Sequence, residues 1–181
     1  MPETTSPWVD GLTIGNMLRR TAERYPDCDA VVFPGLDKQQ QPIPAETAPD
    51  LRANCYRLSF RELDEAVDRV ARSLLGLGIN KGDHVAVWAT NWPRWVLLQF
   101  ATARIGAVLV TVNPAYRSSE LGYVLKQSDA VALFLVDRFR TSDYFAILNE
   151  AVPELAAASA GSLKLGDFPK LRRVVSMKSK A

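Results

Sequence analysis

The first periodic pattern of apolar residues lies between Thr13 and Pro26. Apolar side chains recur there at helical spacing, which is typical of one buried stripe of a helix. The stripe consists of Ile14, Met17, Leu18, Ala22 and Tyr25. Pro26 ends the predicted helix, because proline lacks the N–H that a further turn requires. The opposite face carries mainly charged residues, and we expect it to be solvated.

The clearest helix is predicted from Ser59 to Gly78. Ser59 and Glu62 stand at the spacing of a capping box, in which each side chain bonds the backbone N–H of the other residue. Apolar residues follow at helical spacing: Leu63, Val67, Val70, Ala71 and Leu74. Gly78 suits the left-handed position past a helix, and Ile79 would fold back on Leu74. We therefore expect a Schellman motif at this end.

Two short strands are predicted on either side of a long polar connector. Residues 30–33 and 56–60 are rich in β-branched and aromatic side chains. The connector between them contains four prolines and a run of three glutamines, so we expect a flexible loop over residues 35–54. A tolerated surface insertion is the favoured interpretation of this loop, and a functional lid is the alternative.

In the second half of the chain, apolar β-branched runs alternate with helical patterns. Strands are predicted at residues 84–89, 107–112, 130–136 and 172–177. Helices are predicted at residues 93–105, 121–127 and 142–158, the last with a kink at Pro153. The buried stripe of the first is expected to be Trp95, Leu98, Ala101, Thr102 and Ile105. This alternation predicts an α/β fold, a doubly wound, mostly parallel sheet with helices on both faces.

Composition indicates a globular protein and argues against a nucleic-acid partner. Of the 181 residues, 48% are apolar and 23% are charged, so a packed core is expected. The formal charge is +2, but residues 170–181 hold five of the 22 basic residues and no acidic residue. The rest of the chain is slightly acidic and offers no electrostatic basis for binding nucleic acid.

Cysteine usage and the start of the chain favour a cytoplasmic protein. Cys28 and Cys55 lie far apart, form no CxxC motif and are accompanied by a single histidine. Neither a zinc site nor a disulfide is therefore predicted. The first residues lack the basic and apolar segments of a signal peptide, and no apolar run of about 18 residues predicts a transmembrane segment.

Common nucleotide-binding and catalytic motifs are absent from the sequence. There is no GxxxxGK[ST] loop, no GxGxxG after a strand, no GxSxG and no HExxH. The glycine-rich segment GLGINKGD (76–83) closes a helix and leads into a strand, the reverse of the order that a phosphate-binding loop requires. Motifs alone therefore predict no catalytic, cofactor-binding or metal-binding residue.

Other residues with chemical potential have structural explanations. His84, the single histidine, stands at the first position of a predicted strand, where we expect it to be exposed and non-catalytic. Trp88, Trp92 and Trp95 could line a pocket, but packing is the favoured interpretation.

The segment VTVNPAYRSSEL (110–121) joins a predicted strand to a predicted helix. Pro114 biases Asn113 away from helical conformation and fixes a turn. Ser118 is the expected N-cap of the helix, with Glu120 in its positive first turn. Local chemistry makes Asn113–Arg117 mainly a connector. A binding site stays open as the alternative, because ligands of open α/β sheets collect beyond the carboxyl ends of strands.

Three segments together resemble the opening of an adenylate-forming acyl-CoA synthetase. They are TIGNMLRRTAERYPDCDAVVF, the stretch from LSFREL to DAVALFL, and FPKLRRVVSM. The most characteristic parts are the helix followed by Lys-Gly-Asp and a strand, then GAVLVTVNPAYR and ELGYVL. The resemblance spans residues 13–33 and 58–177, and it is strongest to the medium-chain fatty acyl-CoA synthetase branch.

This resemblance implies a two-step ligase. ATP and a carboxylic (fatty) acid would give an acyl-adenylate and pyrophosphate, and coenzyme A would then displace AMP to form a thioester. Mg²⁺ would neutralise the phosphates. The family's Ser/Thr/Gly-rich ATP loop, its adenosine-binding residues and its C-terminal lysine lie downstream of the matched segment. The resemblance therefore assigns no catalytic, cofactor-binding or metal-binding residue to this chain.

The organisation expected from the resemblance has three parts. They are an N-terminal tail (1–12), a partial N-terminal synthetase subdomain (13–177) and a truncated end (178–181). We expect a segment of a longer synthetase that is inactive by itself and has an unpaired sheet edge near residues 172–177. The alternative is a non-catalytic interaction or binding protein that pairs through this edge, and a homo-oligomer is also open.

Overall fold

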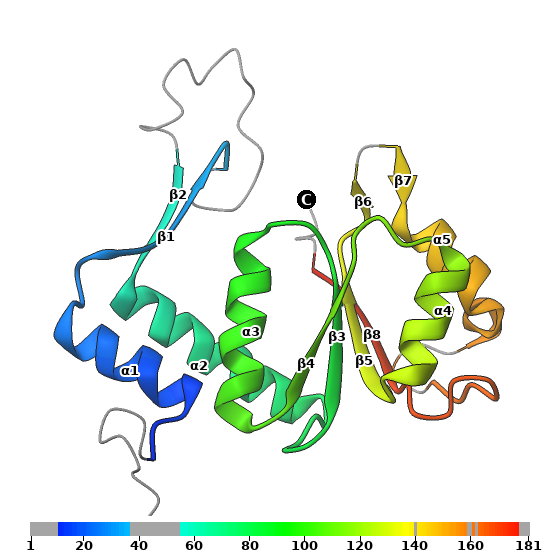
Figure 1. Cartoon of the computed structure of the whole chain (residues 1–181), viewed down its shortest axis with the longest axis horizontal. Coiled ribbons are helices and arrows are strands. Elements are labelled where there is room, and N and C mark those ends of the chain that lie inside the picture. Colours follow the sequence, from blue (N-terminus) through cyan, green and yellow to red (C-terminus); the bar gives the residue numbers. More distant parts are fainter. Residues whose placement is uncertain (1–10, 37–54, 140, 159–160, 162, 178–181) are drawn as a thin grey trace, which may run out of the picture.

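Four parallel strands form the central sheet. The computed structural model describes residues 11–36, 55–139, 141–158, 161 and 163–177. β3 (His84–Trp88) lies between β4 (Val108–Val112) and β5 (Ala130–Leu135), and β8 (Arg173–Ser176) pairs with the far side of β5 (Figure 1). Within the described part of the chain, the order β4-β3-β5-β8 leaves β4 and β8 at the sheet edges.

The two central strands explain why the sheet is covered on both faces. Every residue of β5 is buried, and so is every residue of β3 after His84. Side chains alternate between the faces of a strand. Val85 and Val87 therefore join one hydrophobic core, whereas Ala86 and Trp88 join the other. Strands without a polar face need such two-sided cover.

Helices provide this cover. α1 (Ile14–Arg24), α2 (Phe60–Gly76) and α3 (Pro93–Ile105) lie on one side of the sheet, and α4 (Ser118–Gln127) and α5 (Tyr144–Ala151) lie on the other (Figure 1). The predicted doubly wound α/β architecture is confirmed. No helix in the residues that the structure describes combines the length and apolar character needed to cross a membrane.

Both predicted ends of α2 are confirmed. Ser59 Oγ accepts the Glu62 N–H at 3.3 Å, and Glu62 Oε2 accepts the Ser59 N–H at 2.8 Å. At the other end, Gly78 has φ +79°, and the Ile79 N–H donates to the Leu74 carbonyl at 3.0 Å. The capping box and the Schellman motif therefore satisfy backbone groups that the helix itself leaves unpaired.

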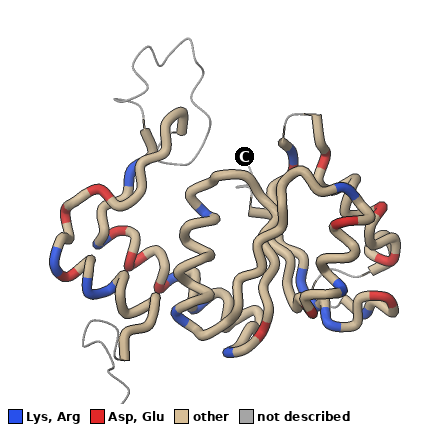
Figure 2. The backbone as a smooth tube through the Cα atoms, viewed as in Figure 1, with Lys and Arg blue, Asp and Glu red and all other residues tan. Residues whose placement is uncertain are grey.

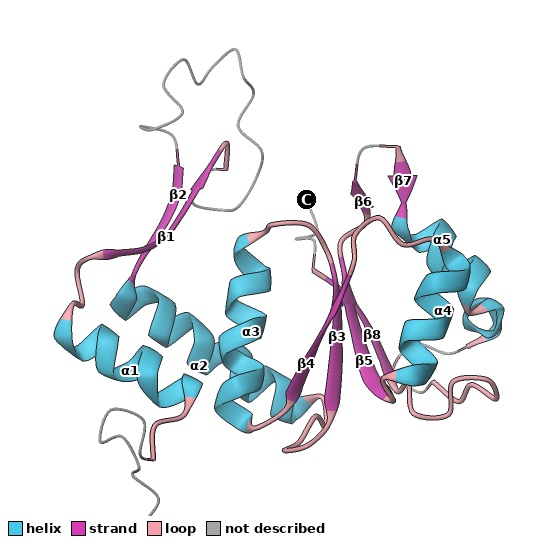
Figure 3. Ribbon diagram, viewed as in Figure 1, coloured by secondary structure: helices cyan, strands magenta, loops and turns pink. Residues whose placement is uncertain are grey.

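A separate antiparallel hairpin projects away from the parallel sheet (Figure 3). Its strands, β1 (Asp29–Pro34) and β2 (Cys55–Ser59), match the two predicted strands to within one residue at each end. The hairpin is tied to the start of α2, because the Phe60 N–H donates to the Cys28 carbonyl at 3.0 Å. Of the predicted flexible loop, residues 37–54 lie outside the described residues.

The apolar stripe predicted for α1 is only partly buried. Leu18 is buried as expected, but Ile14 is 55% exposed and Met17 is 47% exposed. Gly15 lies close against α3, where a Cβ would be only 3.1 Å from Arg104 Cα. Close approach at a glycine thus orients α1, and apolar periodicity carries no signal for such a contact.

The single helix predicted over residues 142–158 is wrong. The region contains β7 (Ser142–Asp143), α5 and the 3₁₀ helix η2 (Pro153–Ala157), and β6 (Arg138–Phe139), which pairs with β7, precedes it. Asp143 Oδ1 accepts the Ala146 N–H at 3.0 Å and thereby caps the start of α5. Pro153 ends α5 and does not kink it, because its ring nitrogen cannot continue the α-helical hydrogen bonds.

Charged residues lie mainly on the helices and connecting turns (Figure 2). One charged cluster joins three helices on one side of the sheet. Arg104 of α3 donates to Asp64 and Asp68 of α2, both at 2.5 Å, and to the Gly15 carbonyl of α1 at 3.3 Å. Arg19 belongs to the charged face of α1 that was expected to be only solvated, and it also bonds Asp68 at 3.2 Å. The cluster therefore cross-links the helical layer.

Candidate functional site

A groove of about 700 Å³ opens beyond the carboxyl ends of β3 and β4. Three segments line it: the turn after β3, the segment Asn113–Arg117 after β4, which we call the hinge, and the β6–β7 hairpin. Its polar groups come from Thr90, Asn91, Asn113, Arg117, Thr141 and Ser142. Ligands of parallel sheets commonly bind at this edge, where the loops that follow neighbouring strands diverge. The segment predicted mainly as a connector therefore also forms a wall of the groove.

Asn113 folds the hinge into a compact turn. Its Oδ1 accepts the Ala115 N–H at 2.9 Å, and its backbone carbonyl accepts the Tyr116 N–H at 3.0 Å. Pro114 lies between these groups and restricts the backbone. The predicted Asn-Pro turn is confirmed.

Two buried aromatic residues contact the hinge backbone. Trp88, at the end of β3, donates from Nε1 to the Asn113 carbonyl at 3.1 Å. Tyr144, the first residue of α5, donates from its hydroxyl to the Pro114 carbonyl at 2.8 Å. The two rings stack with centroids 4.0 Å apart and an interplanar angle of 6°.

The helix after the hinge begins earlier than predicted. Arg117 is its N-cap and Ser118 its first helical residue, so the prediction of a Ser118 cap is wrong. Glu120 satisfies this end in place of a serine hydroxyl, because its Oε2 accepts the Arg117 N–H at 2.9 Å. Its predicted place in the positive first turn is confirmed.

The groove favours an anionic ligand. Arg117 is the one charged residue among the described residues that line it. Its Nη1 donates to Ser142 Oγ at 3.3 Å, which places the guanidinium between the hinge and β7. A guanidinium accompanied by amides and hydroxyls, with no carboxylate in the lining, is suited to phosphate or carboxylate oxygens.

Metal binding is not supported by the same geometry. Among the residues that the structure describes, no three His, Cys, Asp or Glu side chains group as a metal site requires. We therefore assign no step to Mg²⁺ on these residues.

The packing interpretation is confirmed for Trp88 and Trp95. Trp88 is fully buried, and Trp95 packs against the core between the sheet and the helices of α1–α3. Trp92 precedes α3, and its ring meets Phe33 of the hairpin edge-on at 5.9 Å. Its indole N–H is buried without a hydrogen-bond partner in the described part of the chain.

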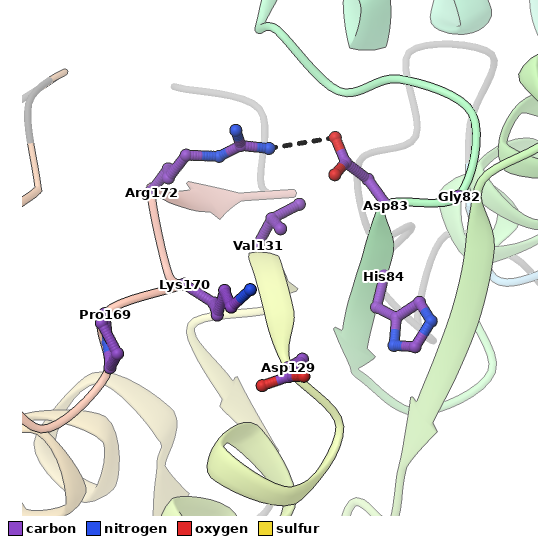
Figure 4. Close-up of a pocket in the computed structure, with 8 residues that line it drawn as sticks. All are labelled: Gly82, Asp83, His84, Asp129, Val131, Pro169, Lys170 and Arg172. Atoms are coloured by element: carbon purple, nitrogen blue, oxygen red, sulfur yellow. Dashed lines mark hydrogen bonds and ion pairs between the residues drawn. The ribbon is translucent and has the colours of Figure 1, made fainter.

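A second pocket, of about 420 Å³, lies at the opposite, amino-terminal edge of the sheet (Figure 4). Arg172 and Asp83 pair there at 3.0 Å, while Lys170 and Asp129 add one charge of each sign. His84 begins β3 as predicted but is half-buried and not exposed, because its Nδ1 bonds the Ser128 carbonyl at 2.6 Å. Balanced charges give this pocket no preference for one sign of ligand, so the carboxyl-edge groove is the stronger candidate.

The sequence pattern predicts one wall of the groove and misses the other two. Thr90 and Asn91 directly follow the predicted strand 84–89, so their place at a strand's carboxyl end is a signal that could have found them. Thr141 and Ser142 have no such signal, because the local pattern predicts the start of a helix where β7 forms.

Solved structures contain the same arrangement of elements. A fatty acyl CoA synthetase of Mycobacterium tuberculosis has a TM-score of 0.62 with this chain at 22% identity, covering 91% of this chain and 26% of its own. Acetoacetyl-CoA synthetase from Streptomyces lividans has a TM-score of 0.64 at 23% identity, covering 94% and 23% respectively. At these identities the likeness establishes the fold alone.

Sequence comparisons identify the family. The model described as AMP-binding enzyme matches residues 18–179, and the chain belongs to this family. YngI of Bacillus subtilis (strain 168), which bears the name of an acyl-CoA synthetase, is 42% identical over 168 residues, or 93% of this chain and 27% of its own. The medium-chain acyl-CoA ligase ACSF2, mitochondrial, of Mus musculus is 40% identical over 165 residues, or 91% and 24%.

These matches confirm the resemblance to medium-chain acyl-CoA synthetases. The chain spans about a quarter of the length of these relatives.

Proposed function

We propose that the chain contributes the N-terminal portion of an ATP-dependent fatty acyl-CoA synthetase. In this reaction the acid carboxylate attacks the α-phosphorus of ATP, which releases pyrophosphate and leaves an acyl-adenylate. The thiol of coenzyme A then attacks the acyl carbon and releases AMP. Membership of the AMP-binding enzyme family supports this proposal.

The observation that carries the proposal on this chain's own residues is the groove at Arg117. ATP and coenzyme A share the chemistry of phosphates on an adenosine. The Arg117 guanidinium would bind a phosphate oxygen, and the amides and hydroxyls that line the groove would orient the nucleotide. Binding and orientation are thus the roles that we assign to this chain, and no lining residue is assigned a proton transfer.

Equilibrium titrations of the 181-residue chain with ATP and, separately, with coenzyme A test the groove. R117Q removes the guanidinium charge, and R20Q on the exposed face of α1 is the matched control. We expect R117Q to weaken binding of the nucleotide that occupies the groove by roughly tenfold, the size of one charge-assisted contact, and R20Q to leave it unchanged. Equal affinity of wild type and R117Q would remove the groove from the proposal.

Activity of the isolated chain is a separate question. We propose that the 181-residue polypeptide alone forms no acyl-adenylate, because about three quarters of the length of its relatives has no counterpart in it. Acid-dependent exchange of labelled pyrophosphate into ATP should stay at background. Exchange above background would show that these residues contain a complete adenylation site.

A non-catalytic interaction protein is the second candidate function. The observation that favours it is the position of β8 at one edge of the sheet that the described residues form, because edge strands can accept further strands. Recovery of the chain as a discrete soluble complex would support this candidate, and a solely aggregated product would count against it.

A cytoplasmic location remains part of our proposal, to be tested by cell fractionation.

A further inference from the structure

We propose that Trp88 and Tyr144 are positioning residues that hold the Asn113–Arg117 hinge in the shape that forms one wall of the groove. This inference rests on the proposed function of the groove as a nucleotide site. It assigns a role to two residues that do not themselves line the groove.

The two residues act on successive carbonyls of the hinge. Trp88 Nε1 holds the Asn113 carbonyl at 3.1 Å, and the Tyr144 hydroxyl holds the Pro114 carbonyl at 2.8 Å. The donors come from different elements, the end of β3 and the start of α5. Side-chain hydrogen bonds therefore fix the hinge both to the central sheet and to the helix that follows the β6–β7 hairpin.

The donors themselves have little freedom to move. Both side chains are fully buried, and their rings stack at 4.0 Å. Burial raises the pKa of Tyr144 above its ordinary value, so the phenol keeps its proton and remains a donor through the neutral range. A rigid, protonated pair of this kind fixes backbone direction at low entropic cost when a ligand arrives.

Hydrogen bonding within the hinge explains why its shape matters for recognition. The N–H groups of Ala115 and Tyr116 are taken by Asn113, and the N–H of Arg117 is taken by Glu120. Recognition of an anion is thus left to side chains, chiefly the Arg117 guanidinium. The direction of that side chain depends on the backbone that the two aromatic residues hold.

The decisive variant is Y144F, which keeps the aromatic stack and removes one hydroxyl. Y123F is the matched control, because Tyr123 is 67% exposed on α4 and lies outside the groove lining. Hydrogen–deuterium exchange on the full 181-residue chain should show the Ala115–Arg117 amides exchanging about fivefold faster in Y144F, as loss of one hydrogen bond predicts. Amides of β5 should not change, and Y123F should match wild type at every position.

Nucleotide affinity supplies the functional readout. Titrated with ATP and with coenzyme A as separate arms, Y144F should bind the nucleotide that R117Q affects about threefold to tenfold more weakly than wild type does. W88F, which removes the other donor, should add little to Y144F in the double variant if both act through the hinge.

The outcomes separate the two ideas. The positioning role is overturned if hinge exchange is unchanged in Y144F, or if exchange at β5 becomes faster as well. It is also overturned if Y144F binds the nucleotide as tightly as wild type does while R117Q fails to bind it. Faster hinge exchange in Y144F, in a chain that binds neither nucleotide, supports the positioning role of Tyr144 and overturns the proposed function of the groove.

Discussion

The Arg104 side chain connects the three helices α1–α3. Its side chain is only 13% exposed, and it pairs with Asp64 and Asp68 in a forked geometry at 2.5 Å. Burial raises the pKa of Asp68, but the hydrogen bond and charge of Arg104, with the charges of Arg19 and Arg72, outweigh this effect and hold the pKa below its ordinary value. The carboxylate therefore remains ionised and stabilises the fold at neutral pH.

R104M should lower the free energy of unfolding by about 2–3 kcal/mol, because it leaves two partly buried carboxylates without their partner. This loss of stability is smaller than for a fully buried pair, since the Asp68 side chain is 33% exposed and partly screened by solvent. Urea unfolding measures the change. R69M, at an exposed position on α2, is the control and should change stability by less than about 0.5 kcal/mol.

The same pair predicts a direction with pH. A carboxyl pKa that is lower in the folded state stabilises the protein above its unfolded value, and this stability is lost as the pH falls through the folded pKa. The stability difference between wild type and R104M should therefore be constant near neutrality and shrink below about pH 4. A difference that stays constant down to pH 2 would contradict the coupling of Arg104 to Asp68.

At the scale of elements, the end of α2 shows how two nearby glycines have opposite requirements. Gly78 has φ +79° in the Schellman motif, whereas Gly76 closes the helix without a positive φ. A Cβ added at either position would meet nothing within 4 Å. Differences between alanine variants at these positions therefore report backbone conformation and not packing.

G78A should destabilise the protein by about 1 kcal/mol, because an L residue is forced into the left-handed region. G76A should stabilise it by roughly 0.5 kcal/mol, because alanine loses less conformational entropy than glycine in a helix. Urea midpoints of the two variants measured side by side test the assignment. A shift of the same sign in both would contradict the Schellman end.

Local patterns predict elements well where local bonds define their ends. The capping box at Ser59 and the Asn-Pro turn at Asn113 form as predicted, because both are completed within a few residues. The region after β5 is different. Phe139 and Ser142 pair across the β6–β7 turn, and this pairing competes with the helical pattern that residues 142–158 present. An isolated pattern cannot weigh a strand partner against a helix.

At the scale of the whole molecule, the residues for which an unpaired edge was predicted form β8, at one edge of the described sheet. β8 is the last strand in the order of the described sheet, with Val174 and Val175 partly buried and Ser176 exposed. Such an edge can pair with another chain when charge does not oppose it.

The candidate site could be predicted only in part. Asn113–Arg117 is recognisable because an Asn-Pro turn follows an apolar strand. The neighbouring wall from Thr141 and Ser142 lies some 25 residues further along the chain, and its approach is visible only in the Arg117–Ser142 hydrogen bond. The support from Trp88 and Tyr144 is likewise hidden, because each residue alone has the pattern of an ordinary core residue.

The sequence by itself determined the alternation of strands and helices, the caps of α2, the hinge turn and the family, since each depends on apolar periodicity or on residues close together in the chain. Only the tertiary structure decided the order of the strands, the orientation of α1 with Gly15 against α3, and the meeting of three segments in the groove at Arg117. Those features depend on contacts between distant segments, and their free energy comes from shape and hydrogen bonding at the contact, which no local pattern records.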